Sequence, residues 1–139
     1  MGGAVHDFRK TADSEKVSIN VGYVDLGQID LLVQEGFYSN RSDFIRTAIR
    51  NLLDRHNDVV QQSVVRHELE LGLRLYDRHY LENAKRRGEL LHIHVLGLAV
   101  IAEDVSPELA RSAIASLRVL GALQARPAVK AALSDRIRS

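Results

Sequence analysis

The sequence predicts an α+β fold built from two different parts. Residues 16–22, KVSINVG, alternate apolar and polar side chains as an amphipathic strand does. Residues 23–56 carry apolar residues at helical spacing, interrupted by one glycine-containing turn. The C-terminal half repeats a short apolar motif that ends in glycine, at intervals of 25 and then 24 residues. We therefore expect a strand and two helices, followed by a domain of β-α repeats.

The composition is that of a globular chain without a strong charge preference. Of the 139 residues, 45% are hydrophobic and 27% are charged, and the net charge is +1. The absence of cysteine excludes disulfides and thiolate metal sites, and it suits a reducing compartment. No apolar run is long enough for a membrane span or a signal peptide. We expect a soluble, cytoplasmic protein with no membrane partner.

The expected strand over 16–22 has an apolar face and a polar face, because side chains alternate across a strand. One short strand cannot bury an apolar face by itself, so it needs a partner element. Its polar residues also suit hydrogen bonding. The apolar set is Val17, Ile19 and Val21, and the polar set is Lys16, Ser18 and Asn20.

Two helices are expected next. The first carries Leu26, Ile29, Leu32 and Val33 at helical spacing and ends at Gly36, the residue type favoured just past a helix C-terminus. The second begins at Asn40, which forms a capping-box pattern with Asp43 and precedes roughly four turns. Its apolar stripe consists of Phe44, Ile45, Ala48, Ile49, Leu52 and Leu53.

The repeated motif reads LELG at 69–72, HVLG at 94–97 and RVLG at 118–121. Each copy is followed by a turn and a short helical pattern; in SPELARSAIASL, Ser106 has the form of an N-cap before a proline. Such units stack strand beside strand, each burying what its neighbour exposes. The three glycines should therefore occupy equivalent strand positions. We expect Gly97 to tolerate a bulky side chain least, and Gly121 to affect mainly assembly.

Residues 16–56 resemble the ribbon-helix-helix family of bacterial DNA-binding regulators, which includes nickel-responsive repressors and many small antitoxins. The resemblance rests on KVSINV and on GFYSNRSDFIRTAIRNLL, where the glycine, the aromatic residue, N-R-S and I-R-x-A-I-R stand in family positions. It covers about 40 of 139 residues, and Gly22 and Tyr23 replace the usual proline. It implies an intertwined homodimer whose strands pair into an antiparallel ribbon.

In that arrangement the polar face of the ribbon enters the major groove of double-stranded DNA. Lysine can donate to guanine, asparagine can pair with adenine, and serine adapts to either base. The amides at the start of the second helix would face a backbone phosphate. Taken alone, the strand also fits an ordinary edge strand with solvated polar residues. The residues expected to contact DNA are Lys16, Ser18, Asn20, Asn40, Arg41 and Ser42.

We expect four segments in the chain. Residues 1–14 form a flexible arm and residues 15–56 the ribbon-helix-helix DNA-binding domain. Residues 57–66 form a linker. Residues 67–139 form the β-α repeat domain, which serves oligomerisation or regulation.

The histidines raise the question of a metal site. His92 and His94 share one face of an expected strand, and His79 precedes them. The nickel-responsive repressors carry a similar series that ends in a cysteine, whose place is taken here by Val100. Square-planar Ni²⁺ requires four ligands, and this chain lacks the thiolate. We expect surface or interface histidines, and no metal or other cofactor.

These patterns favour a dimeric, sequence-specific DNA-binding transcriptional regulator, most simply a repressor that occupies a promoter. An enzyme is not supported, because the chain has no Walker loop and no GxSxG motif. Three alternatives stay open: an antitoxin that binds a toxin partner through residues 57–139, a metal-responsive repressor, and an assembly-forming structural protein. Tetramers or higher oligomers, or another protein partner, would form through residues 67–139.

Overall fold

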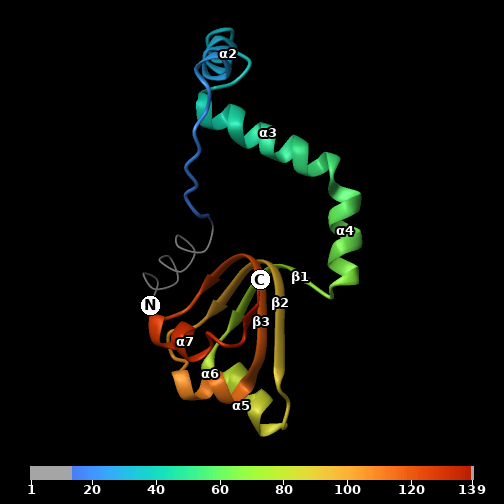
Figure 1. Cartoon of the computed structure of the whole chain (residues 1–139), viewed down its shortest axis with the longest axis vertical. Coiled ribbons are helices and arrows are strands. Elements are labelled where there is room, and N and C mark those ends of the chain that lie inside the picture. Colours follow the sequence, from blue (N-terminus) through green and yellow to red (C-terminus); the bar gives the residue numbers. More distant parts are fainter. Residues whose placement is uncertain (1–13, 139) are drawn as a thin grey trace. The chain divides into compact units, whose positions relative to one another are not determined.

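The computed structural model describes residues 14–138 as two compact units, which divide between Val60 and Gln61 (Figure 1). The arm expected over 1–14 lies outside the described residues, apart from Ser14. Each unit has its own elements and its own packing.

The N-terminal unit begins with residues 14–22, which form neither helix nor strand in the single chain. The strand expected over 16–22 is therefore not present here. The physical reason is that a strand is defined by its backbone ladder, and residues 14–138 of one chain provide no partner for this segment. Three helices follow: α2 (Tyr23–Gln34), α3 (Arg41–Arg55) and α4 (Asn57–Arg66).

Both expected helices are confirmed. Helix α2 ends in a Schellman motif, in which the Gly36 N–H donates to the Val33 carbonyl and the Phe37 N–H donates to the Leu32 carbonyl. Gly36 has a φ of 85°, a left-handed conformation that glycine adopts without a steric cost. Helix α3 then starts after Asn40 as expected and runs for 15 residues.

The segment 57–66, expected as a linker, is helical. Helix α3 ends at Arg55, His56 is its C-cap residue, and α4 begins at Asn57. The Val60 N–H donates to the His56 carbonyl, so the backbone turns through His56 with little loss of hydrogen bonding. The connection between the units is therefore formed by a helix.

The C-terminal unit combines helices with a parallel sheet, consistent with an α+β class. The sheet has four strands in the order β1-β2-β3-β4, and all neighbouring pairs are parallel. One helix lies between each pair of successive strands. The elements are β1 (Glu70–Tyr76), α5 (Arg78–Arg86), β2 (Leu91–Ile101), α6 (Pro107–Ala113), β3 (Ile114–Gln124), α7 (Pro127–Ala132) and β4 (Ile137–Arg138).

The register pairs the residues that the 25- and 24-residue offsets align. Gly72 lies opposite Gly97, and Gly97 lies opposite Gly121. All three have φ between 122° and 138°, so a side chain at these positions would project within the sheet. A Cβ at Gly97 would overlap the Gly72 carbonyl oxygen, and one at Gly121 would overlap that of Gly97.

The expectation for Gly121 is therefore wrong. Its Cβ would strike the backbone of β2, so a substitution there affects the fold itself and not mainly assembly. Each Cβ points toward the preceding strand, and in the described residues no strand precedes β1 in the sheet. Gly72 is for this reason the position with open space around it.

The three helices cover one face of the sheet. Their buried residues, such as Leu81, Ala110 and Val129, form a single core with alternate residues of β2 and β3. The opposite face carries leucines that remain 41–53% exposed on β1 and β3. We call this opposite surface the leucine face; it consists of the exposed Leu71, Leu73, Leu75 and Leu120, together with the half-buried Leu96 and the buried Leu98 of β2.

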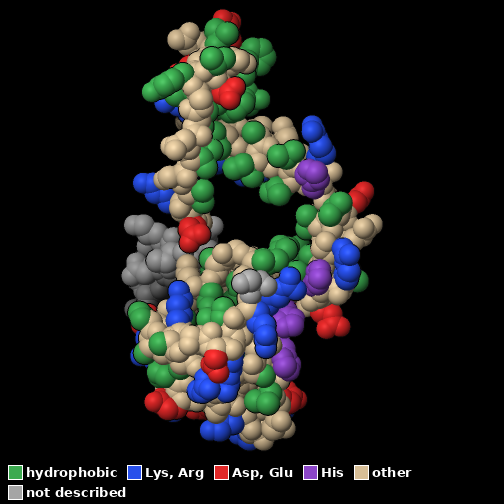
Figure 2. Space-filling model, in the orientation of Figure 1, with side chains coloured by type: hydrophobic (Ala, Val, Ile, Leu, Met, Phe, Trp, Pro, Cys, Tyr) green, Lys and Arg blue, Asp and Glu red, His purple; other side chains and the backbone are tan. Residues whose placement is uncertain are grey.

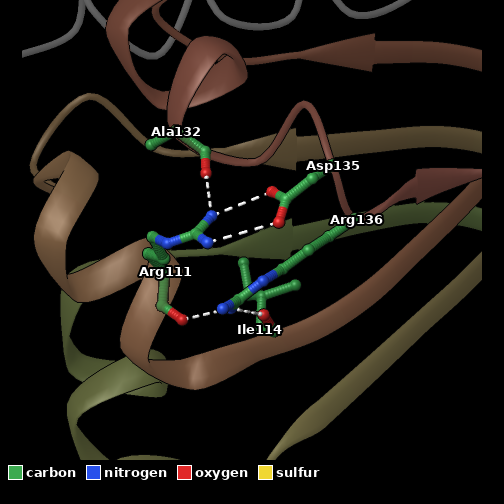
Figure 3. A network of polar contacts seen from close by, with 5 residues as sticks. All are labelled: Arg111, Ile114, Ala132, Asp135 and Arg136. Atoms are coloured by element: carbon green, nitrogen blue, oxygen red, sulfur yellow. Dashed lines mark hydrogen bonds and ion pairs between the residues drawn. The ribbon is translucent and has the colours of Figure 1, made fainter.

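A polar network closes the helix-covered side (Figure 3). Arg111 of α6 donates to the Asp135 carboxylate at 2.9 Å and to the Ala132 carbonyl at 2.7 Å. Arg136 donates to the carbonyls of Arg111 and Ile114. The network ties α6 to the turn after α7 and so holds β4 beside β3.

Candidate nucleic-acid interface

The six residues expected to contact DNA all lie in the N-terminal unit, in two groups. Lys16, Ser18 and Asn20 lie in the irregular segment before α2, and all three are exposed. Asn40, Arg41 and Ser42 come together at the start of α3. No hydrogen bond or ion pair joins the two groups within residues 14–138.

The segment before α2 exposes its apolar residues as well as its polar ones. Val17 is 77% exposed and Ile19 is 68% exposed. Two β-branched side chains left in water forgo the stabilisation that burial provides, about 1.5–3 kcal/mol for each. Nothing in the described part of one chain covers this face.

The start of α3 is capped as the sequence predicts, with one difference. The Asn40 Oδ1 accepts from the Asp43 N–H at 2.8 Å. The Asp43 carboxylate accepts at 2.9 Å from the N–H of Ser39, one residue before the N-cap. In a capping box that carboxylate would accept from the N-cap residue itself. The amides of Arg41 and Ser42 make no hydrogen bond within residues 14–138 and point out of the helix end.

The Arg41 side chain is bound within the unit. Its Nε and Nη2 donate to the two carboxylate oxygens of Asp30 on α2, both at 2.8 Å. The hydrogen bonds between the two side chains lower the pKa of the Asp30 carboxyl group and raise the pKa of the Arg41 guanidinium group. The pair fixes the start of α3 against α2. Sequence reasoning missed Asp30, because a pair eleven residues apart on different helices leaves no periodic signal.

The N-terminal unit has little core of its own. Helix α3 has no buried residue, and Ile29 is the one buried residue of α2. Tyr38 packs edge-on against Phe44, with ring centroids 5.1 Å apart. Figure 2 shows hydrophobic side chains over much of the visible surface of this unit. The exposed large ones include Val17, Ile19, Leu31, Phe37, Ile49, Leu52 and Leu53.

The histidines lie on different sides of the C-terminal unit. His92 and His94 lie on β2, on the side of the leucine face, and the His92 Nδ1 is 2.8 Å from the Ser116 hydroxyl. His79 lies on α5 and hydrogen-bonds with Asn83. No group of three or more histidine, aspartate or glutamate side chains within 14–138 is arranged to hold a metal ion. In the same residues, no helix has the length and apolar character needed to cross a membrane.

Comparison with known proteins extends the similarity beyond the N-terminal unit. A family model described as the ribbon-helix-helix transcriptional regulator family matches residues 12–130. The transcriptional regulator CdrS of Halobacterium salinarum is 32% identical over 44 residues, which are 32% of this chain and 80% of that protein. No solved structure matches the chain.

The family match includes β1, β2 and β3, which the resemblance over residues 16–56 left out. The C-terminal residues carry a repeat but no motif that pointed to the family, so sequence reasoning did not find this part. Both matches are to proteins described as transcriptional regulators, not as enzymes. The chain belongs to the ribbon-helix-helix transcriptional regulator family.

Proposed function

We propose that this protein binds specific DNA sequences as a homodimer and represses transcription by occupying a promoter. Two chains intertwine, and their residues 16–22 pair as an antiparallel ribbon. Its polar face lies in the major groove, where Lys16, Ser18 and Asn20 contact bases. Repression needs no further activity, because a bound dimer blocks access to the promoter. The protein then acts in the cytoplasm, as expected from its sequence.

The incomplete core of the N-terminal unit is the observation that carries this proposal. Val17 and Ile19 are exposed, and the apolar stripe of α3 is at best half-buried. A second copy supplies a matching strand and two further helices, so both exposed surfaces become buried together. The apolar face of the ribbon then lies on the helices, which leaves the polar face free for DNA.

The start of α3 supplies a phosphate contact in this arrangement. The free N–H groups of Arg41 and Ser42 stand at the positive end of the helix dipole, where anions bind. Asn40 caps the helix and Arg41 is held by Asp30, so both side chains orient the site without binding phosphate directly. The nearby Asp43 carboxylate weakens the attraction, which makes base contacts relatively more important.

The C-terminal domain, residues 67–139, joins dimers through the leucine face. Exposed apolar patches of this kind mark interaction surfaces. The partner is the same domain of another dimer. Because each dimer carries two C-terminal domains, the first contact between two dimers raises the local concentration for the second contact. Two linked dimers bind tandem operator sites more tightly than a single dimer does.

Sequencing of DNA that the protein retrieves from its own genome identifies the operator. Binding to that operator and to random DNA is then compared for Asn20→Ala and for Gln34→Ala. Gln34 is an exposed amide on α2 with no assigned role, which makes it a matched control. We expect Asn20→Ala to lose about 1–3 kcal/mol on the operator alone. An equal loss on both DNAs, or in both variants, would contradict base reading by Asn20.

A further inference from the structure

Three basic side chains form a row across the leucine-face side of the sheet. His94 of β2 lies opposite Arg118 of β3, and Arg118 lies opposite Arg138 of β4. Residues in register on neighbouring parallel strands share a face and lie about 5 Å apart. Leu117, the neighbour of Arg118, is fully buried under the helices, so Arg118 points to the other side. We call His94, Arg118 and Arg138 the arginine row.

No carboxylate within residues 14–138 forms an ion pair with the row. None of the ion pairs within residues 14–138 involves Arg118 or Arg138. Like charges directly opposite each other on neighbouring strands destabilise a sheet. Two guanidinium groups in this position therefore need a counter-charge that residues 14–138 do not supply. We leave the neighbouring His92 out of the row, because its ring is hydrogen-bonded to the Ser116 hydroxyl.

Arg118 is distinguished from the other arginines of the C-terminal unit. Its Nε is buried and has no hydrogen-bond partner. Arg111 and Arg136 on the helix-covered side are fully engaged (Figure 3). Arg126 also has a buried Nε without a partner, but its Nη2 donates to the Val105 carbonyl. A buried donor left unpaired is rare and is usually satisfied by a water or an ion.

The charges of the row match one class of ligand. Two guanidinium groups balance a phosphate monoester, which carries a charge of about −1.5 to −2 at neutral pH. The planar fork of arginine binds phosphate oxygens through paired N–H groups. In Figure 2, histidine side chains lie beside basic side chains along one flank of the visible sheet unit. We propose that the arginine row binds the phosphate group of a small phosphate monoester, with Arg118 and Arg138 as charged donors and His94 beside them.

This site is separate from the ribbon and requires no DNA, so it can be tested without an operator. Isothermal titration of the full-length protein with methyl phosphate, inorganic phosphate and acetate is performed at constant ionic strength. We expect one methyl phosphate to bind per chain. Inorganic phosphate should bind with similar affinity, and acetate should bind at least about tenfold more weakly. In a ¹⁵N spectrum the Arg118 Nε–H signal shifts as methyl phosphate is added.

Arg118→Gln and Arg138→Gln should each weaken methyl phosphate binding at least about tenfold, since a charge-assisted hydrogen bond is lost. Arg86→Gln, an exposed arginine on α5, is the matched control and should bind as the unaltered protein does. Arg138 lies at the exposed end of the sheet, so its variant remains informative if Arg118→Gln does not fold.

Several results would overturn the site. One is the absence of saturable methyl phosphate binding to the unaltered protein. Another is equal binding by the row variants and Arg86→Gln. A third is that Arg118→Gln binds methyl phosphate as the unaltered protein does and loses affinity only for random-sequence DNA, which would assign the row to a nucleic-acid surface.

Discussion

The glycines in the middle of the sheet adopt a positive φ, and at two of them a side chain would overlap the neighbouring strand. At Gly97 and Gly121 a Cβ would overlap a carbonyl oxygen of the preceding strand, whereas Gly72 faces open space. The repeat could be read from the sequence and the register follows it. The direction in which a Cβ would point at each glycine could not be predicted from the sequence, because it depends on a positive φ that no sequence pattern indicates.

Alanine at these glycines should therefore have unequal effects on stability. Gly72→Ala should cost about 1–3 kcal/mol, the strain of a non-glycine residue at an unfavourable φ. Gly97→Ala and Gly121→Ala should each cost about 1–3 kcal/mol more, because the backbone must also move apart. Urea denaturation of the three variants measures this. Equal midpoints would show that steric overlap between strands is not limiting.

Tyr76 at the end of β1 should make the stability of the C-terminal unit depend on pH in the alkaline range. Burial raises the pKa of its phenol to about 12, against about 10 in an unfolded chain. The folded state thus holds the proton more tightly. The resulting stability is complete below about pH 10 and is lost as the pH rises to about 12.

Tyr76→Phe should remove this alkaline step in stability. The step amounts to at most about 3 kcal/mol, since one pKa unit corresponds to about 1.4 kcal/mol. Thermal unfolding of the two proteins between pH 9 and pH 12 measures it, a range that follows from the pKa values. If both lose stability in parallel over that range, another group is responsible.

Among the elements, the segment 16–22 is the one whose expected strand needs a partner strand that residues 14–138 of one chain do not provide. Its alternation predicts a strand, yet no strand within residues 14–138 pairs with it. The helices differ, because their hydrogen bonds close within the element. Caps at Asn40 and Gly36 could therefore be predicted from sequence, while the pair between Asp30 and Arg41 depends on how two helices pack.

A carboxylate on either face of this segment should have opposite consequences. Ile19→Asp should abolish the homodimer, because a buried, unpaired carboxylate costs several kcal/mol, comparable with the stability of so small a unit. Ser18→Asp places the same charge on the polar face, so the dimer should persist while DNA binding is lost. Sedimentation and circular dichroism compare the two variants. A helical dimer of Ile19→Asp would reverse the assignment of faces.

For the whole molecule, the function that we propose assigns DNA binding to the N-terminal unit and assembly to the C-terminal unit. The division between Val60 and Gln61 falls within α4, where sequence patterns suggested only a connection. Helix α4 was not predicted because valines and polar residues in NDVVQQSVVR give no clear start or stop signal. The family match through residue 130 shows that the C-terminal unit is part of the family's architecture.

Residues 1–60 alone should dimerise and bind a single operator site with the affinity of the full chain, since their core is completed by the partner copy. The full chain should show larger assemblies in light scattering and tighter binding to tandem sites. If the shortened protein keeps the full oligomeric state, assembly does not depend on the C-terminal unit.

The most direct measurement of the central claim is a map of base preference. Binding of the unaltered protein, Lys16→Ala and Asn20→Ala is measured against operators that each carry one base-pair change. Because the dimer is symmetric, each variant should lose discrimination at one base pair in each half-site and keep it elsewhere. Uniform weakening of all operators, with every base preference retained, would mean that these side chains contact the DNA backbone and that the ribbon does not read sequence.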